Sequence, residues 1–203
     1  VQAVLVEGLR QAGLEILPWN RALLGWVRRA AFSGKWWTGA DPWPGFDEGT
    51  LRDDLDHWLG PFLPGCRTVK AIGEGRLRQA LAARLSWSQQ AALDRLAPTH
   101  IMVPSGSRLP VDYDHDPPIL KVRIQEMFGA ARTPTVADGR QPLLLHLLSP
   151  ARRPMQVTQD LEQFWRTGYP LVKKELHGRY PRHHWPEDPL AAVPTRRAKP
   201  RKP

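Results

Sequence analysis

Residues 103–153 read VPSGSRLPVDYDHDPPILKVRIQEMFGAARTPTVADGRQPLLLHLLSPARR, and this stretch decides the fold. Short apolar runs alternate in it with clusters of Gly, Pro, Asp and Ser, a pattern typical of a compact β unit. We expect strands at residues 100–103, 109–113, 119–124, 142–148 and 155–158. Five short strands favour a small antiparallel β-barrel over an open parallel sheet. The barrel is predicted to span residues 98–160.

The residues before this stretch follow a helical pattern. Apolar side chains recur at three- and four-residue spacing in the segments 2–12, 20–32, 47–59, 75–84 and 87–96. Three of these segments begin at or directly after a residue suited to cap a helix, namely Asn20, Asp47 and Ser86. Residues 1–97 are therefore expected to form a helical bundle that ends at Ala97-Pro98.

The residues after the β unit are basic. Residues 161–188 are expected to form a helical extension that Gly168-Tyr169-Pro170 interrupts. Residues 189–203 are expected to be a flexible basic tail, because prolines exclude regular structure and five of the last eight residues are cationic. The predicted fold class is thus α+β, with a helical bundle, a small barrel, a helical extension and a tail.

The charge of the chain is unevenly distributed. The 203 residues include 29 Lys and Arg against 20 Asp and Glu, a net charge of +9. Residues 101–203 carry 17 basic and 10 acidic side chains, so most of the excess lies there. A basic half favours an anionic partner, most often nucleic acid, although an arginine-rich solvated surface has the same composition.

Composition also indicates the cellular compartment and the kinds of partner to expect. The single cysteine, Cys66, excludes an internal disulfide framework and favours a reducing compartment. No apolar run approaches the roughly 18 residues of a membrane span. We therefore expect a cytoplasmic monomer with no membrane partner.

Motifs for catalysis are missing from this sequence. It contains no GxxxxGK[ST] phosphate loop, no GxGxxG and no GxSxG, so neither a nucleotide site nor a nucleophile can be assigned. The adjacent His183 and His184 point to opposite sides of an extended chain, which disfavours a shared metal. Ser105-Gly106-Ser107 offers N–H groups to a phosphate, but such a triplet more often forms a hairpin turn.

The basic side chains are the more informative candidates. The candidate nucleic-acid-binding residues are Arg108, Arg152, Arg153, Arg166, Lys173, Lys174, Arg179 and Arg182. Cations contact phosphates, and nearby aromatic residues such as Trp165 and Tyr180 can stack on unpaired bases. For Trp165 we favour a place in the core instead. Arg152, Arg153 and the loop around Ser105 are expected to lie in one groove.

Several long strings carry a resemblance to a known family. VPSGSRLPVDY, VRIQEMFG, RQPLLLHLLSPARRPMQVTQDLEQFW and GRYPRHHWPEDPLAAVPTRR are similar to the C-terminal region of bacterial HrpB-type ATP-dependent helicases, superfamily 2 proteins related to the DEAH/RHA RNA helicases. The resemblance is dense from about Leu96 to Arg197. Upstream it is looser, in LVEGLRQAGLEILPW and LDHWLGPFL.

The resemblance implies a fold and a function. Residues 1–97 would be a ratchet-like helical region, residues 98–160 a barrel of the oligonucleotide/oligosaccharide-binding (OB) type, and the remainder a family-specific extension. Two RecA-like motor domains, with their ATP and Mg²⁺ sites, would precede Val1. The implied partners are single-stranded RNA and those motor domains, and no catalytic residue or cofactor is carried over to this chain. The alternative is a docking module without direct RNA binding, with Trp185 as its aromatic anchor.

Overall fold

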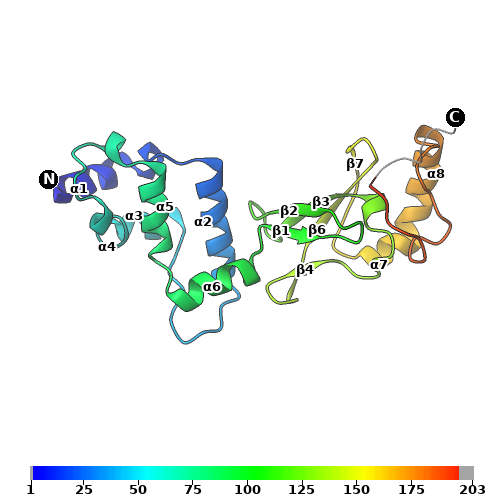
Figure 1. The fold of residues 1–203 in the computed structure, drawn as a ribbon, viewed down its shortest axis with the longest axis horizontal. Coiled ribbons are helices and arrows are strands. Elements are labelled where there is room, and N and C mark those ends of the chain that lie inside the picture. The colour runs from blue at the N-terminus through cyan, green and yellow to red at the C-terminus, as the bar shows by residue number, and fades with distance from the viewer. Residues whose placement is uncertain (1, 197–203) are drawn as a thin grey trace. The chain divides into compact units, whose positions relative to one another are not determined.

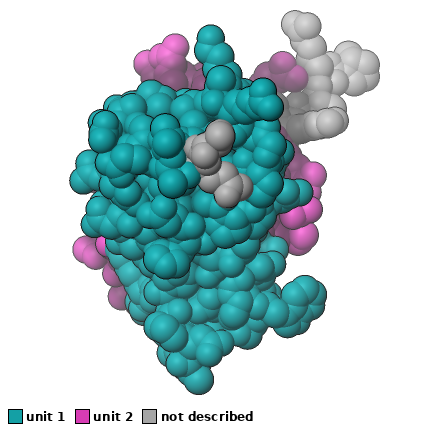
Figure 2. Space-filling model, turned by 90° about the vertical axis from the view of Figure 1, so that its left-hand side faces the viewer, with its two compact units in different colours: residues 1–97 teal, residues 98–203 magenta. Residues whose placement is uncertain are grey.

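The computed structural model describes residues 2–196, and the chain divides into two compact units, residues 1–97 and residues 98–203 (Figure 1, Figure 2). The first unit is helical and the second contains a sheet followed by a helix. The chain therefore has an α+β fold. The finer predicted division at residues 160 and 188 stays a prediction, and the last predicted tail residues, 197–203, lie outside the described part.

The first unit is built from short helices joined by irregular loops. These are α1 (Gln2–Ala12), α2 (Arg21–Gly34), α3 (Glu48–Asp53), α4 (Leu55–Trp58), α5 (Glu74–Ala82) and α6 (Trp87–Leu96), with single 3₁₀ turns at Leu14–Ile16, Gly60–Phe62 and Val69–Ala71. The predicted segments are confirmed, except that the segment 47–59 is divided at Asp54 into two helices.

The predicted helix caps form as the sequence indicates. The side chain of Asn20 accepts a hydrogen bond from the Leu23 amide at 2.8 Å, and that of Asp47 accepts one from the Thr50 amide at 2.9 Å. Ser86 begins α6 in a full capping box. These contacts satisfy amide groups that the first turn of a helix leaves without partners.

Apolar side chains of these helices form one core in the first unit. Leu55 and Leu59 are fully buried there, together with Trp58. On α1, Val6 is 2% exposed and faces this core, whereas Val4 is 75% exposed. Val6 and Leu9 are three residues apart and share the buried side of the helix.

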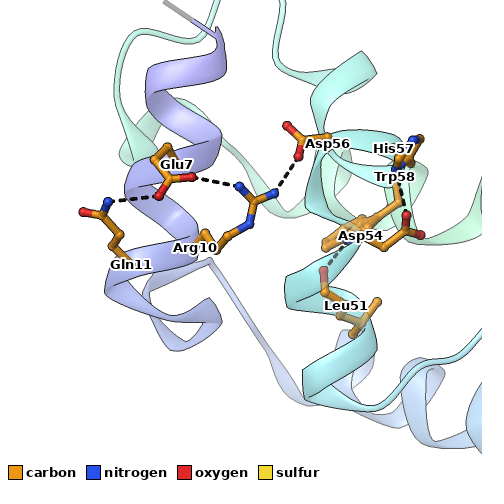
Figure 3. A network of polar contacts seen from close by, with 8 residues as sticks. All are labelled: Glu7, Arg10, Gln11, Leu51, Asp54, Asp56, His57 and Trp58. Atoms are coloured by element: carbon orange, nitrogen blue, oxygen red, sulfur yellow. Dashed lines mark hydrogen bonds and ion pairs between the residues drawn. The ribbon is translucent and has the colours of Figure 1, made fainter.

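A polar network joins α1 to α4 (Figure 3). Arg10 donates to Glu7 at 2.8 Å on its own helix and to Asp56 at 2.5 Å on α4. Hydrogen bonds from Gln11 and Arg10 lower the pKa of the Glu7 carboxyl. Because these groups are exposed, each pair adds little stability, and the core burial beneath them dominates.

The second unit contains a five-stranded sheet in the order β1-β2-β3-β6-β7. Its strands are β1 (His100–Met102), β2 (Arg108–Asp112), β3 (Ile119–Arg123), β6 (Leu144–Leu148) and β7 (Pro154–Thr158); β4 (Thr135–Val136) and β5 (Gln141–Pro142) form a separate small hairpin. All five predicted strands are present, and each end lies within two residues of its predicted place. The small hairpin was not predicted.

The predicted antiparallel barrel is wrong. Strands β3 and β6 pair in parallel, from Ile119 opposite Leu144 to Arg123 opposite Leu148, and the other neighbours pair antiparallel. Within the described residues β1 and β7 do not pair with each other, so the mixed sheet is open. Parallel pairing needs a long crossover, and residues 124–143 supply it.

The core of the second unit follows from strand alternation. Leu145 and Leu147 point to the buried face of β6, and Leu120 and Val122 do so on the neighbouring β3. Phe128, just after a 3₁₀ turn at Ile124–Glu126, is also fully buried. The sheet therefore has one closely packed face, against which the later helix lies.

The helix after the sheet is not broken where the sequence predicts. It runs as α7 (Leu161–Gln163), a π-helical turn (Phe164–Gly168) and α8 (Tyr169–Arg179). The π turn absorbs the hydrogen bond that Pro170 cannot make. Trp165 and Tyr169 face the ring of Phe128 with centroid distances of 6.0 and 5.9 Å. The predicted core position of Trp165 is confirmed.

The residues after α8 return to the sheet. We call residues 180–196 the C-terminal segment. Gly129 donates its amide to the Pro189 carbonyl at 2.9 Å, and Thr195 donates to the Gln125 carbonyl at 2.9 Å. These two hydrogen bonds join residues 189–196 to the rest of the unit, and Trp185 in the predicted extension is buried. The flexible tail at residues 189–203 stays a prediction.

Candidate nucleic-acid interface

The register of the sheet brings two turns to the same end. Arg123 at the end of β3 is opposite Leu148, and Leu148 is opposite Pro154 of β7, so the turn 149–153 lies beside the end of β3. Strand β2 is antiparallel to β3, so its first residue, Arg108, lies toward this end too. The Ser105 amide, in the preceding turn, donates to the Glu126 carbonyl at 3.2 Å.

The C-terminal segment adds cations to this end. The Arg196 Nε atom donates to the Ser105 carbonyl at 2.8 Å. The charges of Arg123 and Arg182 both contribute to a lowered pKa of His183, after burial. We call this region the basic end of the sheet, and its arginines are Arg108, Arg123, Arg152, Arg153, Arg182 and Arg196.

The opposite end of the sheet is acidic. Asp112 ends β2, and Asp114 and Asp116 follow in the loop before β3, so all three lie toward the start of β3 and away from Arg123. Charge is thus separated along the strand direction. Such a separation gives an anionic polymer one preferred end of the sheet.

The turn 149–153 presents two arginines to solvent. Ser149 is buried, its amide donates to the Arg153 carbonyl at 2.8 Å, and its Oγ accepts from the Arg153 amide at 3.1 Å. Arg152 has a φ of 61°, a left-handed conformation that costs a non-glycine residue about 1–2 kcal/mol. Both arginine side chains are exposed and pair with no acidic side chain among residues 2–196.

The turn Ser105-Gly106-Ser107 has no free amide for a phosphate. The Ser105 amide bonds to Glu126, the Gly106 amide to the Val103 carbonyl at 2.8 Å, and the Ser107 amide to the Ser105 Oγ atom at 3.3 Å. Gly106 has a φ of 75°, as a tight turn requires. The alternative of an ordinary hairpin turn therefore fits this triplet.

Glu126 connects this turn to β3. Its carboxylate accepts from Ser107 Oγ at 2.6 Å, from Ser105 Oγ at 3.2 Å and from Arg123 Nε at 3.0 Å. Burial acts to raise the pKa of this carboxyl, but the hydrogen bonds from Arg123 and the two serines outweigh it and hold the pKa below its ordinary value. Glu126 is therefore ionised at neutral pH although it is only 3% exposed.

His183 is half-buried in a cationic environment. Its pKa is lowered, first by burial and then by the charges of Arg123 and Arg182. The amide of His183 donates to the Tyr180 carbonyl at 3.1 Å, and the two rings meet edge-on with centroids 6.0 Å apart. His183 is thus fixed in position and carries little charge at neutral pH.

The other predicted cations lie on the helical residues. Arg166 pairs with Glu162 and Lys173 pairs with Glu187, whereas Lys174 and Arg179 are exposed on α8. Among the described residues, no hydrogen bond or ion pair joins these side chains to the turn 149–153. The structure therefore brings together only part of the predicted set, and the binding role of every member stays a prediction.

The aromatic side chains in this region are structural. Trp165, Tyr169 and Trp185 are buried, and their polar atoms donate to backbone carbonyls, Trp165 Nε1 to Ala130 at 2.8 Å and Tyr169 Oη to Pro186 at 3.0 Å. Trp185, the aromatic anchor of the alternative docking module, is 8% exposed, so its ring packs within the chain. With these rings buried, the basic end offers charge for a phosphate backbone more than faces for bases.

Sequence reasoning missed three residues of the basic end. Arg123, Glu126 and His183 were not among the candidates. The spacing of Arg123 and Glu126 is that of a helical ion pair, which gives no sign of burial. The doublet His183-His184 gave no signal because the search was for metal ligands. Among the described residues, no group of three metal-binding side chains occurs and no helix has the length and apolarity to cross a bilayer.

Comparison with known proteins places these features in a family. The family described as ATP-dependent helicase C-terminal, HrpB_C, matches residues 58–189, more than half of the chain. The chain belongs to this helicase C-terminal family. The ATP-dependent RNA helicase HrpB of Escherichia coli (strain K12) is 44% identical over 196 residues, which cover 96% of this chain and 24% of that protein.

Solved structures agree with this family. A crystal structure of the E. coli DExH-box NTPase HrpB matches with a TM-score of 0.85 and 43% identity, over 95% of this chain and 24% of that one. A crystal structure of the Escherichia coli DEAH/RHA helicase HrpB matches with a TM-score of 0.74 and 40% identity, over 91% of this chain and 23% of that one. This HrpB C-terminal chain thus spans about a quarter of the relatives it matches.

Proposed function

We propose that this chain is the accessory region of an ATP-dependent RNA helicase and that its basic end binds single-stranded RNA and gates its path. ATP hydrolysis belongs to motor domains outside this sequence, which would hold ATP and Mg²⁺ and would be partners of this region. The relative named as an RNA helicase supports the choice of RNA. A cytoplasmic, monomeric protein without a membrane partner is part of the same proposal.

The observation that carries the proposal is the exposed pair Arg152 and Arg153 at the end of the sheet where other arginines gather. Cations attract a phosphate backbone whatever the base sequence, and a translocating motor requires such sequence-independent contact. The buried aromatic residues of the same unit agree with backbone binding.

Fluorescence anisotropy tests the proposal with the full 203-residue chain and a labelled oligouridylate of about twelve nucleotides. We expect salt-sensitive binding, because each lost phosphate contact lowers the slope of log K against log salt by about 0.7 for a single strand. The double variant R152A/R153A should bind more weakly with a smaller slope. R132A is the matched control, because Arg132 is an exposed cation away from the basic end. The hydroxyl of its neighbour Thr133 donates to the carbonyl of Gln159, which follows the far end of β7.

A second candidate function is docking onto the motor domains without RNA contact. One observation favours it, because Trp87 is 86% exposed at the rigid, capped start of α6. Exposed Trp residues are frequent centres of protein interfaces. Under this alternative, W87A would weaken association with the separately expressed motor domains, and the parent chain would not bind oligouridylate.

A further inference from the structure

We infer that the solvent-facing side of the five-stranded sheet binds single-stranded RNA, with Lys121 contacting a phosphate and the His146 ring stacking on an unpaired base. This inference rests on the proposed function and deepens it, because it adds a base contact and extends the interface beyond the turn 149–153. Neither residue was a candidate from the sequence, and neither belongs to the basic end.

The sheet has two faces of different character. On β6, Leu145 and Leu147 are fully buried, whereas His146 between them is partly exposed. On β3, Lys121 is exposed and its neighbour Leu120 is fully buried. Successive side chains of a strand point to opposite faces, so the leucines face the core and the other two residues face solvent. We call the side that carries Lys121 and His146 the open face.

The register of the sheet places three side chains of the open face in one row. Lys121 of β3 is opposite His146 of β6, and His146 is opposite Val157 of β7, which is 50% exposed. Neighbouring strands lie about 5 Å apart, so the row is about 10 Å long. Among residues 2–196, neither Lys121 nor His146 has a hydrogen bond or an ion pair. A cation, a ring and an apolar side chain therefore lie side by side and available to a ligand.

The charge of the open face is complementary to an anion. Strand alternation places Arg108 and Asp112, at opposite ends of β2, on this face as well. Asp112 is opposite Ile119, which is only 5% exposed, so the acid lies where the face is covered. The exposed part carries the cations Arg108 and Lys121, and no strand residue of the described chain adds an acid to it. Such a surface attracts a phosphate backbone.

The open face is continuous with the turn 149–153. Lys121 lies two residues before Arg123, about 7 Å along β3. Arg123 is opposite Leu148, the residue directly before that turn. A strand of RNA held by Arg152 and Arg153 can therefore extend over the open face and place its next phosphates near Lys121.

The row of side chains suits a single strand in particular. Bases that are free of pairing stack on aromatic side chains, histidine included, while cations contact the phosphates between them. In this unit Trp165 and Tyr169 are buried, whereas the His146 ring is partly exposed next to the apolar Val157. The ligand class is thus single-stranded RNA, bound through its backbone at Lys121 and through one base at His146.

The test uses the full chain in anisotropy titrations with two probes, the labelled oligouridylate and an abasic oligonucleotide of the same length. K121Q removes the cation and keeps a long side chain. It should weaken binding to both probes and reduce the slope of log K against log salt by about 0.7, the effect of one lost phosphate contact. H146A should weaken oligouridylate binding by about fivefold or more and leave both the salt slope and the abasic probe unaffected.

Conservative variants separate these contacts from a structural effect. K121R keeps the charge and H146F keeps a ring, so both should bind oligouridylate like the parent chain. K70A is the matched control, because Lys70 is an exposed lysine on the 3₁₀ turn of the first unit and should not change binding. Thermal melting of each variant sets a titration temperature at which the chain is folded.

The outcomes distinguish the inference from the function on which it rests. If R152A/R153A weakens binding but K121Q and H146A match the parent chain, the site on the open face is refuted and the proposed function stands. Equal losses for K121Q and K70A refute the phosphate contact, and equal losses of H146A on both probes refute base stacking. If the parent chain does not bind at low salt, both the proposed function and this site are refuted.

Discussion

Substitutions of Arg152 should separate the stability of the fold from RNA binding. Its φ of 61° lies in the left-handed region, which disfavours every side chain with a Cβ. Arg152→Ala keeps this strain and removes the cation, whereas Arg152→Gly removes both. The comparison of the two variants therefore isolates the backbone.

The magnitude follows from two opposing contributions. Relief of left-handed strain stabilises by about 1–2 kcal/mol. The greater freedom of glycine in the unfolded chain costs about 0.5–1 kcal/mol. At the midpoints of these two ranges the glycine variant is more stable than the alanine variant by about 0.5–1 kcal/mol. For a unit of this size the difference raises the melting temperature by a few degrees, about 2–6 °C.

Thermal melting and RNA titration of the two variants check this prediction together. We expect Arg152→Gly to melt above Arg152→Ala, and both to bind oligouridylate equally weakly, since both lack the guanidinium. An equal or lower melting temperature for the glycine variant would show that Arg152 is not in the left-handed region. Parent-like binding by either variant would remove Arg152 from the interface.

Three further predictions concern the packing around the site. The pKa of Glu126 in the folded chain is below its ordinary value of 4.5, so its ionised form stabilises the second unit above pH 4.5. This stabilisation is lost as the pH falls through the lowered pKa. Acid titration followed by circular dichroism should show the loss in the parent chain but not in E126Q. Trp165→Ala should destabilise by about 3–5 kcal/mol, since the ring is buried against Phe128, and urea unfolding measures this. Ser86→Ala should cost about 1 kcal/mol by loss of the α6 capping box, and an unchanged urea midpoint would contradict the observed cap.

Local features of the fold could be predicted from the sequence. The caps at Asn20, Asp47 and Ser86 depend on residues three positions apart, so the sequence pattern contains the whole interaction. The strands could be predicted for the same reason, since apolar runs and turn residues are contiguous. The core position of Trp165 agreed with helical spacing on the face that carries Leu161.

Features that depend on distant residues could not be predicted. The crossover between β3 and β6 sets their parallel pairing. The apolar pattern of a strand does not indicate which other strand it pairs with or in which direction. The C-terminal segment looked loose because prolines prevent regular structure, yet hydrogen bonds join it to Gln125 and Gly129. Turn composition likewise gave no sign of the left-handed φ at Arg152, where Gly or Asn is usual.

The residues of the candidate site likewise divide into those that the sequence identifies and those that it does not. Exposed Arg152 and Arg153 could be identified because a basic turn between strands faces solvent. Arg123 and Glu126 could not, because their importance comes from burial and from the serines of a turn almost twenty residues earlier in the chain. The ion pair of Lys173 with Glu187 could not be predicted either, because Glu187 lies in a later segment of the chain.

The central claim is that the basic end of the sheet binds the RNA backbone. The most direct measurement is the salt dependence of oligouridylate binding by the parent chain and by R152A/R153A, with R132A as control. Two lost phosphate contacts should reduce the slope of log K against log salt by about 1.4. Equal slopes and equal affinities for the parent chain and R152A/R153A would contradict the claim.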